Sequence, residues 1–243
     1  MPRQARLDAP GTLHHVMLRG IERRAIVTDD ADRQDFVRRL GALALQSRTA
    51  VYGWALLTNH AHLLLRSGPY GLPQLMRRFL TGYAQAYNRR HERYGHLFQN
   101  RYKSIVCEED SYFVELLRYI HLNPIRAGLV GTLSDLERYP WSGHGVLLGE
   151  VEGSWQEREW VLSWFGKTAN SAKKAYREFV AEGLGQGRRP ELVGGRQVRS
   201  AGGWSVVRGR SQQKAGDRRI LGGDVFVDTV LREAEERIRQ QLE

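Results

Sequence analysis

Residues 51–66 read VYGWALLTNHAHLLLR, and this stretch decides the fold. Its two parts, VYGWALLTN (51–59) and HAHLLLR (60–66), are rich in the β-branched, aromatic and aliphatic residues that strands favour. Asn59 lies at the break between them, and asparagine favours a tight turn. Two strands joined by so short a connection can pair only in the antiparallel direction. The stretch therefore predicts a β-hairpin and, with it, an antiparallel sheet.

The segments on either side of this hairpin alternate between strand and helix patterns. Residues 12–19 (TLHHVMLR) and 101–109 (RYKSIVCEE) resemble strands. Apolar residues recur at helical spacing after Asp29, between about residues 73 and 93, and again after Asp110. The resulting order, βα, ββ, α, β, α, predicts an α+β protein, an antiparallel sheet with helices packed on it, of ferredoxin-like type.

The composition restricts the class of protein. Lys and Arg number 37 against 27 Asp and Glu, so the formal net charge is +10, which indicates a polyanionic partner. No run of about 18 apolar residues is present, and the N-terminus lacks the apolar core of a signal peptide, so we expect no membrane-spanning segment. The single cysteine, Cys107, excludes an intramolecular disulfide framework and a multi-cysteine zinc finger, and it suits a reducing cytoplasm.

The chain changes in character near residue 145. We expect one domain over residues 1–145 and a basic, mostly helical C-terminal extension over residues 146–243. In the extension, Ser154 with Glu157 resembles a capping box before a Trp-rich helix, a second helix is expected near 171–182, and a third follows Gly223. The Gly-rich stretch 183–223 is either a flexible basic linker or a set of short strands such as GWSVVRG (203–209).

Two histidines stand out on the second strand of the hairpin. His60 and His62 are two residues apart, so both imidazoles leave the same face of a strand. Two neutral imidazoles on one face can bind a divalent metal when a third ligand comes from elsewhere. Taken alone, such a pair is more often structural, so the spacing leaves both interpretations open.

The helix expected after Asp110 carries two further candidates. Tyr119 and Asn123 are four residues apart and so lie on one face of a helix. Asparagine offers an amide oxygen as a ligand, and tyrosine offers a phenol as a nucleophile. From spacing alone, Tyr119 equally suits the half-buried face of an amphipathic helix. Pro124 disfavours helical geometry at Asn123, which weakens the shared-face argument there.

Basic residues gather between the hairpin and the last predicted strand. From Arg66 to Lys103 there are eight of them and one acidic residue, Glu92, and tyrosines such as Tyr87 and Tyr94 are interleaved. Basic groups with aromatic platforms are typical of a groove that binds single-stranded nucleic acid. A solvated arginine face over core tyrosines would give the same pattern.

Four motifs in order resemble a known family. WALLTNHAHLLL (54–65), GHLFQNRYKS (95–104), YIHLNPIRAGLV (119–130) and the early LRGIERRAIV (18–27) are together similar to the REP-associated tyrosine transposases. These are single-tyrosine members of the superfamily named for its His-hydrophobic-His motif. The resemblance covers about residues 8–145. The central residue of the motif is Ala61, which is small for that position.

The resemblance implies an active site. His60 and His62 become ligands of a divalent metal, Mg²⁺ or Mn²⁺, Asn123 completes the metal site, and Tyr119 becomes the nucleophile that cleaves single-stranded DNA. The product would be a 5′-phosphotyrosine and a free 3′-OH. Two nitrogen ligands by themselves favour Zn or Mn over Mg, so here the choice of metal follows the resemblance.

The resemblance also implies the partner, single-stranded hairpin DNA of the repetitive palindromic type. We expect a cytoplasmic, nucleoid-associated protein that acts as a monomer or homodimer, without a membrane partner. The candidate DNA contacts are basic residues of the first strand and its turn, of the long helix and of the segment after it: Arg19, Arg23, Arg24, Arg77, Arg78, Arg89, Arg90, Arg101 and Lys103.

Two functions remain open. The first is a metal-dependent DNA endonuclease and strand transferase that uses Tyr119. The second is a catalytically idle protein that binds DNA or RNA hairpins in a sequence-specific manner. A basic membrane-associated or ribosome-associated protein would account neither for the histidine pair nor for the tyrosine-bearing helix, and no basic amphipathic helix stands out for a membrane.

Overall fold

The computed structural model describes residues 7–187, 189–193, 217 and 219–240. The expected order of elements is confirmed over the first 121 residues. In chain order they are strand β1 (Leu13–Arg19), the short 3-10 helix η1 (Ile21–Arg23), helix α1 (Asp30–Ser47), strands β2 (Ala50–Leu56) and β3 (His60–Arg66), helix α2 (Leu72–Arg90), strand β4 (Lys103–Cys107) and helix α3 (Glu109–His121).

The second half adds helices α4 (Asn123–Arg126), α5 (Leu133–Arg138), α6 (Gly143–Leu148), α7 (Arg158–Ser163) and α8 (Ala169–Glu182). The last described elements are the 3-10 helices η2 (Leu184–Gln186) and η3 (Pro190–Val193), strand β5 (Ile220–Leu221) and helix α9 (Asp224–Gln240). The predicted strand GWSVVRG lies outside the described residues.

A five-stranded sheet with the order β2-β3-β1-β4-β5 forms the centre of the molecule. The predicted hairpin of β2 and β3 is antiparallel, and so are the pairs β1–β3 and β1–β4. The two-residue strand β5 is the exception, because it runs parallel to β4. The predicted α+β fold is confirmed, with this short parallel edge as an addition.

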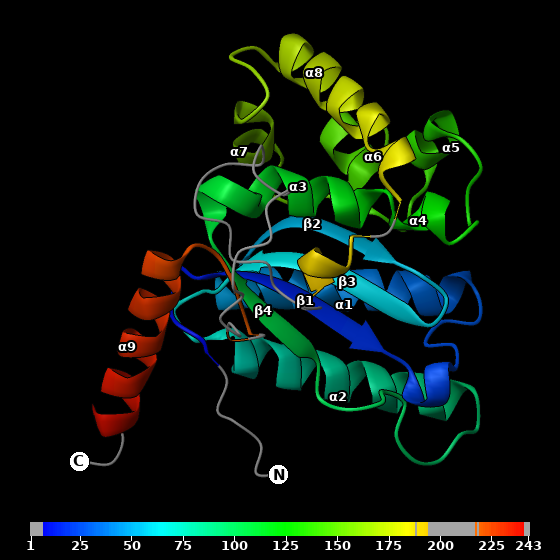
Figure 1. Cartoon of the computed structure of the whole chain (residues 1–243). Coiled ribbons are helices and arrows are strands. Elements are labelled where there is room, and N and C mark those ends of the chain that lie inside the picture. Colours follow the sequence, from blue (N-terminus) through cyan, green and yellow to red (C-terminus); the bar gives the residue numbers. More distant parts are fainter. Residues whose placement is uncertain (1–6, 188, 194–216, 218, 241–243) are drawn as a thin grey trace.

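Helices cover both faces of the sheet (Figure 1). On one face α1 and α2 pack on alternate strand residues such as Leu63 and Leu65, and Phe36 and Phe79 of the two helices meet in this core. On the other face α3 packs on Leu64 and its neighbours. Because side chains alternate along a strand, successive residues of β3 point into the two cores alternately. The face under α3 also receives His60 and His62.

The helices after α3 extend the core on its side of the sheet. Val161 of α7 and Tyr176 of α8 are buried in the same cluster as Leu116 of α3. Inside it the hydroxyl of Tyr176 is hydrogen-bonded to Nδ1 of His121 at 2.6 Å and to Nδ1 of His144 at 2.7 Å. This buried polar group joins α3, α6 and α8. The boundary expected at residue 145 stays a prediction.

The capping box expected at Ser154 is wrong. Helix α7 begins only at Arg158, and its N-cap residue, Glu157, makes no side-chain capping bond. The reason is that the preceding segment pairs with the sheet: Glu157 N donates to Val51 O at 2.9 Å, and the buried Gln156 accepts from Trp54 Nε1. Because this segment is hydrogen-bonded to β2, the helix begins only after it.

The outer sides of β2 and β4 are both covered by later parts of the same chain. At β2, Leu56 N donates to Trp141 O at 2.9 Å, beside the Gln156 segment. At β4, Val106 N donates to the carbonyl of Arg219 at 2.8 Å, and α9 packs alongside through Val227. Among the described residues, no helix is both long and apolar enough to cross a bilayer.

Candidate active site and nucleic-acid interface

Strand β3 presents the two histidines side by side on the face under α3. His60 and His62 alternate with Ala61 and Leu63, which face the opposite core. Their ring centroids are 5.2 Å apart. In the register of the sheet, His60 lies opposite Arg19 and His62 opposite Met17 of β1. The same-face geometry predicted from the spacing of the two residues is therefore confirmed.

Helix α3 brings Tyr119 to this pair. The tyrosine ring lies edge-on to the His62 ring with centroids 5.7 Å apart, and its centroid is 6.0 Å from that of His15 on β1. Two elements that are separated by α2 and β4 in the sequence thus place a phenol beside an imidazole. The structure brings the three predicted side chains together at one end of the sheet, while their chemical roles stay predictions.

Asn123 lies at the end of the same helix. Helix α3 ends at His121 and α4 begins at Asn123, so the two are not in one continuous helix. The Asn123 side chain nevertheless stays near Tyr119, because its Nδ2 donates to the carbonyl of Tyr119 at 2.8 Å. Since the nitrogen is used in this bond, the side-chain oxygen is the atom of Asn123 that could serve as a ligand.

Hydrogen bonds orient the His60 ring. Asn59 Oδ1 lies 2.6 Å from His60 Nδ1, and a side-chain amide oxygen only accepts, so Nδ1 carries the proton and Nε2 keeps its lone pair. Burial and the nearby charge of Arg19 lower the pKa of His60 to about 4. Burial also lowers the pKa of His62 well below its usual value. Both imidazoles are therefore neutral near pH 7, as metal ligands must be.

A cavity of about 460 Å³ opens beside these residues. His60, His62, Tyr119 and Asn123 all line it. Three of the predicted DNA contacts, Arg19, Arg101 and Lys103, line it too. Basic side chains around a cavity that contains a phenol and two neutral imidazoles suit a phosphate group as the ligand.

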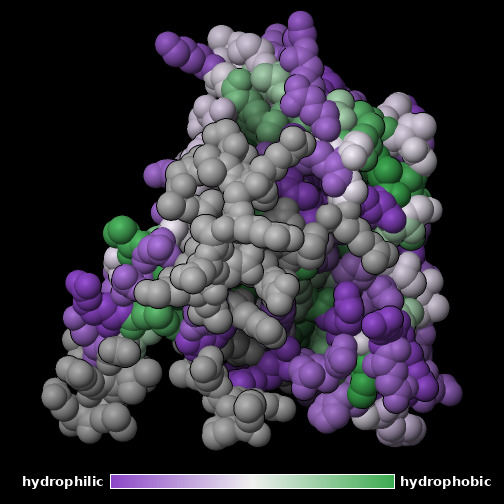
Figure 2. Space-filling view, viewed as in Figure 1, coloured by the Kyte–Doolittle hydropathy of each residue, from purple (hydrophilic) through white to green (hydrophobic). Residues whose placement is uncertain are grey.

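The other predicted DNA contacts lie outside this cavity. Arg23 and Arg24 are exposed in the turn after β1. The four on α2 are Arg77, Arg78, Arg89 and Arg90, and this helix packs on the opposite face of the sheet from the histidines. Figure 2 shows a hydrophilic surface over this side of the molecule, around α2 and η1.

Comparison with known proteins finds a family match over part of the chain. Residues 11–123 match the family model described as transposase IS200-like. This segment is therefore similar to the IS200-like transposases. The resemblance stated from the sequence motifs is confirmed at that level. A solved structure entitled "Structure of the REP associates tyrosine transposase bound to a REP hairpin" matches 65% of this chain and 98% of its own, with 16% identity and a TM-score of 0.49. No curated protein gives a significant match.

The turn after β1 in this segment has an unusual backbone. Glu22 and Arg23 have φ angles of 53° and 61°, in the left-handed region that non-glycine residues rarely adopt. Gly20 allows the tight turn, because a Cβ there would lie 2.0 Å from the carbonyl oxygen of Arg24. The side chain of Asn59 holds the turn by donating to the carbonyl of Arg23 at 2.9 Å. Asn59 thus connects the arginine turn to His60.

Two residues outside the predicted set also contact the site. The guanidinium of Arg126 lies 5.3 Å from the centre of the Tyr119 ring. Arg126 belongs to α4, which is not continuous with α3, so helical spacing from Tyr119 could not have signalled this contact. The second is His15, which lies two residues before Met17 on β1 and so points to the same face of the sheet. Its ring is hydrogen-bonded to that of His62.

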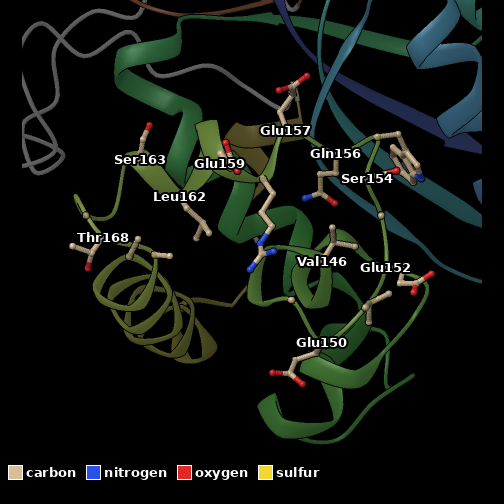
Figure 3. Close-up of a pocket in the computed structure, with 18 of the residues that line it drawn as sticks. Val146, Glu150, Glu152, Ser154, Gln156, Glu157, Glu159, Leu162, Ser163 and Thr168 are labelled. Atoms are coloured by element: carbon tan, nitrogen blue, oxygen red, sulfur yellow. The ribbon is translucent and has the colours of Figure 1, made fainter.

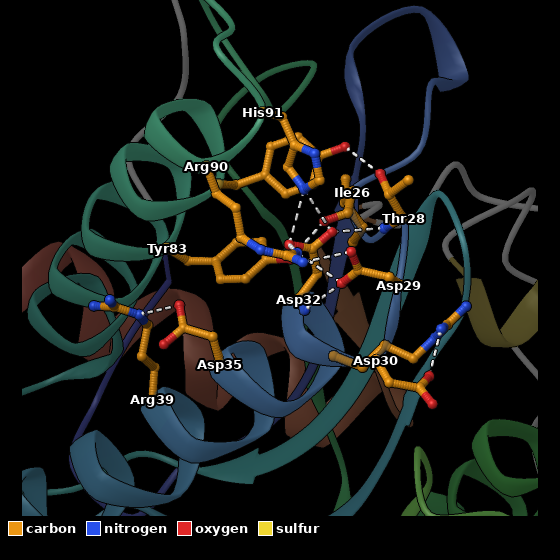
Figure 4. Close-up of polar contacts among 12 residues, drawn as sticks. Ile26, Thr28, Asp29, Asp30, Asp32, Asp35, Arg39, Tyr83, Arg90 and His91 are labelled. Atoms are coloured by element: carbon orange, nitrogen blue, oxygen red, sulfur yellow. Dashed lines mark hydrogen bonds and ion pairs between the residues drawn. The ribbon is translucent and has the colours of Figure 1, made fainter.

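A separate cluster of Asp and His side chains lies on the other face of the sheet (Figure 4). Ligand atoms of Asp29, Asp32 and His91 lie within 4.8 Å of one another, as in a cation site. However, Arg90 donates to both Asp29 and Asp32 at 2.6 Å, and these bonds hold the pKa of Asp29 well below its usual range. An arginine already supplies the positive charge, so this cluster fastens α1 to α2.

A larger cavity, of about 1130 Å³, lies in the extension among α6, α7 and the start of α8 (Figure 3). Four glutamates line it against two basic residues, Arg158 and Lys167, and this excess of negative charge disfavours a phosphate ligand. Its buried Gln156 uses both ends of the amide, accepting from Trp54 and donating to the Tyr52 carbonyl. The cavity beside the histidines is therefore the better candidate for the active site.

Proposed function

We propose that the protein cleaves and rejoins single-stranded DNA with Tyr119 as the nucleophile. The observation that carries the proposal is the position of the Tyr119 ring against His62, in one cavity with both histidines and with Arg19 and Lys103. Cationic side chains beside a tyrosine favour the binding of a phosphate within reach of its hydroxyl. A tyrosine that served only in packing would not require such cations around it.

The proposed reaction is a transesterification, in which one phosphodiester bond of the DNA is exchanged for a bond to Tyr119. The Tyr119 oxygen attacks the scissile phosphorus in line with the leaving 3′ oxygen. An O–P bond forms as the P–O3′ bond breaks, and the proton lost by the phenol balances the proton gained by the 3′-OH. The product is a 5′-phosphotyrosine, and attack of a 3′-OH on it reverses the step. Bond energy is conserved, so joining needs no nucleotide triphosphate.

Positively charged side chains favour this step. Arg19 and Lys103 line the cavity and can neutralise the phosphate oxygens. Arg126, above the Tyr119 ring, favours the negative charge that develops on the phenol as it loses its proton. Holding the phosphate and the nucleophile in one cavity lowers the entropy cost of bringing them together in the correct orientation.

The residues present fit a divalent metal. His60 commits its Nδ1 to Asn59 and His62 commits its Nδ1 to His15, so each keeps Nε2 for an ion. Asn123 keeps its side-chain oxygen. We propose that these three residues hold Mg²⁺ or Mn²⁺, with phosphate oxygens and water as further ligands. When bound, the ion would polarise the scissile phosphate and neutralise its charge.

We propose single-stranded hairpin DNA as the substrate. The exposed Arg23 and Arg24 lie next to Asn59 and thus near the His60 end of the cavity, where a hairpin stem beside the scissile strand would meet them. The arginines of α2 lie on the opposite side of the sheet from the cavity. We therefore expect them to contribute less to hairpin binding than Arg23 and Arg24. Replacing Arg23 and Arg24 together should weaken hairpin binding more than replacing Arg77 and Arg78 together.

The test is formation of a covalent adduct. The protein is incubated with a single-stranded hairpin substrate and Mg²⁺ or Mn²⁺, then denatured. Wild type should give an adduct that survives denaturation, and Tyr119→Phe should give none. Tyr112→Phe, the same change on the same helix, is the matched control and should retain the adduct.

Binding measured in the same preparations separates the two functions that remained open. His60→Ala with His62→Ala should abolish cleavage and leave hairpin affinity mostly intact. If wild type binds the hairpin but forms no adduct with either metal, the protein is an idle hairpin binder. An adduct that persists in Tyr119→Phe would assign the nucleophile to another residue.

A further inference from the structure

His15 is a buried histidine whose two ring nitrogens both have partners. It lies on β1 between β3 and β4 and is fully buried. Its Nε2 is 3.0 Å from Nδ1 of His62, and its Nδ1 is 3.0 Å from the carbonyl oxygen of Leu192. The chain Leu192–His15–His62 therefore runs from η3 across β1 to β3.

The chemistry of these partners decides where each proton lies. A carbonyl oxygen only accepts, so the Nδ1 of His15 must carry a proton. A neutral imidazole has one N–H, so the Nε2 of His15 accepts, and the Nδ1 of His62 must donate to it. The proton of His62 is thereby held on Nδ1, and its Nε2 is left with a lone pair.

We propose that His15 is a positioning residue that, together with the carbonyl of Leu192, holds the tautomer of His62 in which Nε2 can bind a divalent metal ion. The inference rests on the proposed function for what Nε2 binds, since the tautomer itself does not depend on cleavage. Metal-binding histidines elsewhere in proteins use the same device, with the second nitrogen donating to a carbonyl or carboxylate.

The proposal gives the C-terminal extension a part in the active site. Leu192 is fully buried, and Lys103 Nζ donates to the carbonyl of the next residue, Val193. Two consecutive carbonyls of this segment are thus held by side chains from β1 and β4. The extension sets the orientation of a histidine on β3 that lies 130 positions earlier than Leu192 in the printed sequence.

The ring contacts agree with a positioning role. The His15 ring is stacked on that of His62, with centroids 5.2 Å apart and an angle of 29° between the planes. The same two rings form the surface on which Tyr119 lies edge-on. Fixing the orientation of the His62 ring therefore also fixes one of the surfaces against which Tyr119 packs.

The neighbouring His14 offers a matched control. It is as fully buried as His15 and lies on the same strand, but it points to the opposite face, where Nδ1 is 2.9 Å from the Ser104 hydroxyl and Nε2 is 3.3 Å from Asp8. A change at His14 removes a buried histidine of equal exposure without touching His62.

The experiment measures the tautomer directly. Nitrogen-15 NMR of the metal-free protein distinguishes the protonated from the unprotonated ring nitrogen of His62. Wild type and His14→Phe should carry the proton on Nδ1, whereas His15→Phe should lose this preference. His15→Gln can still accept from His62 and donate to Leu192, so it should retain the wild-type tautomer.

A titration with Mn²⁺ alone, followed by the free-ion EPR signal, gives the second readout. His15→Phe should bind Mn²⁺ about 10–100-fold more weakly than wild type, and His15→Gln and His14→Phe should bind it nearly as tightly. A wild-type His62 protonated on Nε2, or a His15→Phe variant with unchanged tautomer and Mn²⁺ affinity, would overturn the proposal.

The two proposals fail separately. Absence of an adduct, or of Mn²⁺ binding to the wild type, would contradict the proposed function, while the NMR measurement would still decide the tautomer. If His15→Phe does not fold, the tautomer in wild type and in His15→Gln still decides the question.

Discussion

Replacing Asp32 by asparagine should destabilise the protein far more than the same change at Asp30. Both carboxylates lie in the first turn of α1, so each substitution removes a similar interaction with the helix N-terminus, worth about 0.3–1 kcal/mol. Asp30 is 72% exposed and pairs with Arg33, whereas the side chain of Asp32 is 2% exposed. The difference between the two variants therefore isolates the network around Asp32.

The contacts in Figure 4 give the expected size of this difference. Asp32 accepts from Thr28 N at 2.8 Å, from Arg90 Nη1 at 2.6 Å and from His91 Nε2 at 2.8 Å. An amide of the same shape keeps one oxygen and sets an N–H group against one of these donors. A lost hydrogen bond to a charged group costs about 1.5–3 kcal/mol, and an unsatisfied buried donor costs about 1–3 kcal/mol.

Solvent reduces the total, because Arg90 is 44% exposed and water can replace part of its bond. We expect a loss of about 2–4 kcal/mol in the free energy of unfolding for Asp32→Asn, and of about 1 kcal/mol or less for Asp30→Asn. Urea unfolding followed by circular dichroism measures both. Losses that agree within about 0.5 kcal/mol would refute the assignment of this cluster as the fastening between α1 and α2.

The remaining predictions concern the active site and the extension. Arg126→Ala should slow adduct formation by Tyr119 about 10–100-fold in single turnover, a change of about 1.4–2.7 kcal/mol in the barrier, and Arg126→Lys should recover part of it; an equal loss of hairpin affinity would instead make Arg126 a binding residue. Asn59→Ala should slow cleavage about tenfold or more, because His60 loses the acceptor that sets its proton, and unchanged single-turnover rates would contradict this. Burial lowers the pKa of His144 to about 3, so the unfolded chain binds a proton that the folded chain excludes as the pH falls below about 6.5. His144 should therefore contribute a loss of stability of about 1.4 kcal/mol per pH unit between about pH 6.5 and about pH 3, in addition to the losses from other histidines whose pKa is lowered by burial, such as His60 and His62, and none above about pH 6.5. Urea unfolding of His144→Gln should show a shallower slope than wild type, and equal slopes would refute this cause.

Much of the site was predictable because the relevant patterns are local. Alternation along a strand places His60 and His62 on one face wherever the strand lies, and this needs no knowledge of its neighbours. Asn123 stays close to Tyr119 beyond the end of α3 at His121 because its side-chain Nδ2 donates to the carbonyl of Tyr119.

The capping box at Ser154 shows why a local pattern can fail. The residues have the right spacing for a helix start, but Glu157 pairs its backbone with β2 instead. A hydrogen bond to a distant strand competes with the helical bond, and only the folded chain decides between them.

By itself, then, the sequence determined the order of strands and helices, the shared face of the two histidines and the basic charge that attracts a polyanion. The tertiary structure alone decided which groups meet across the sheet. His15 reaches His62 from 47 residues away and Leu192 from 177 residues away. Helical periodicity shows which side of α2 faces outward, but it carries no information on which face of the sheet the helix covers. The arginines of α2 and the histidines therefore ended on opposite faces, because strand alternation and helix periodicity are local properties, whereas the packing of layers depends on the whole chain.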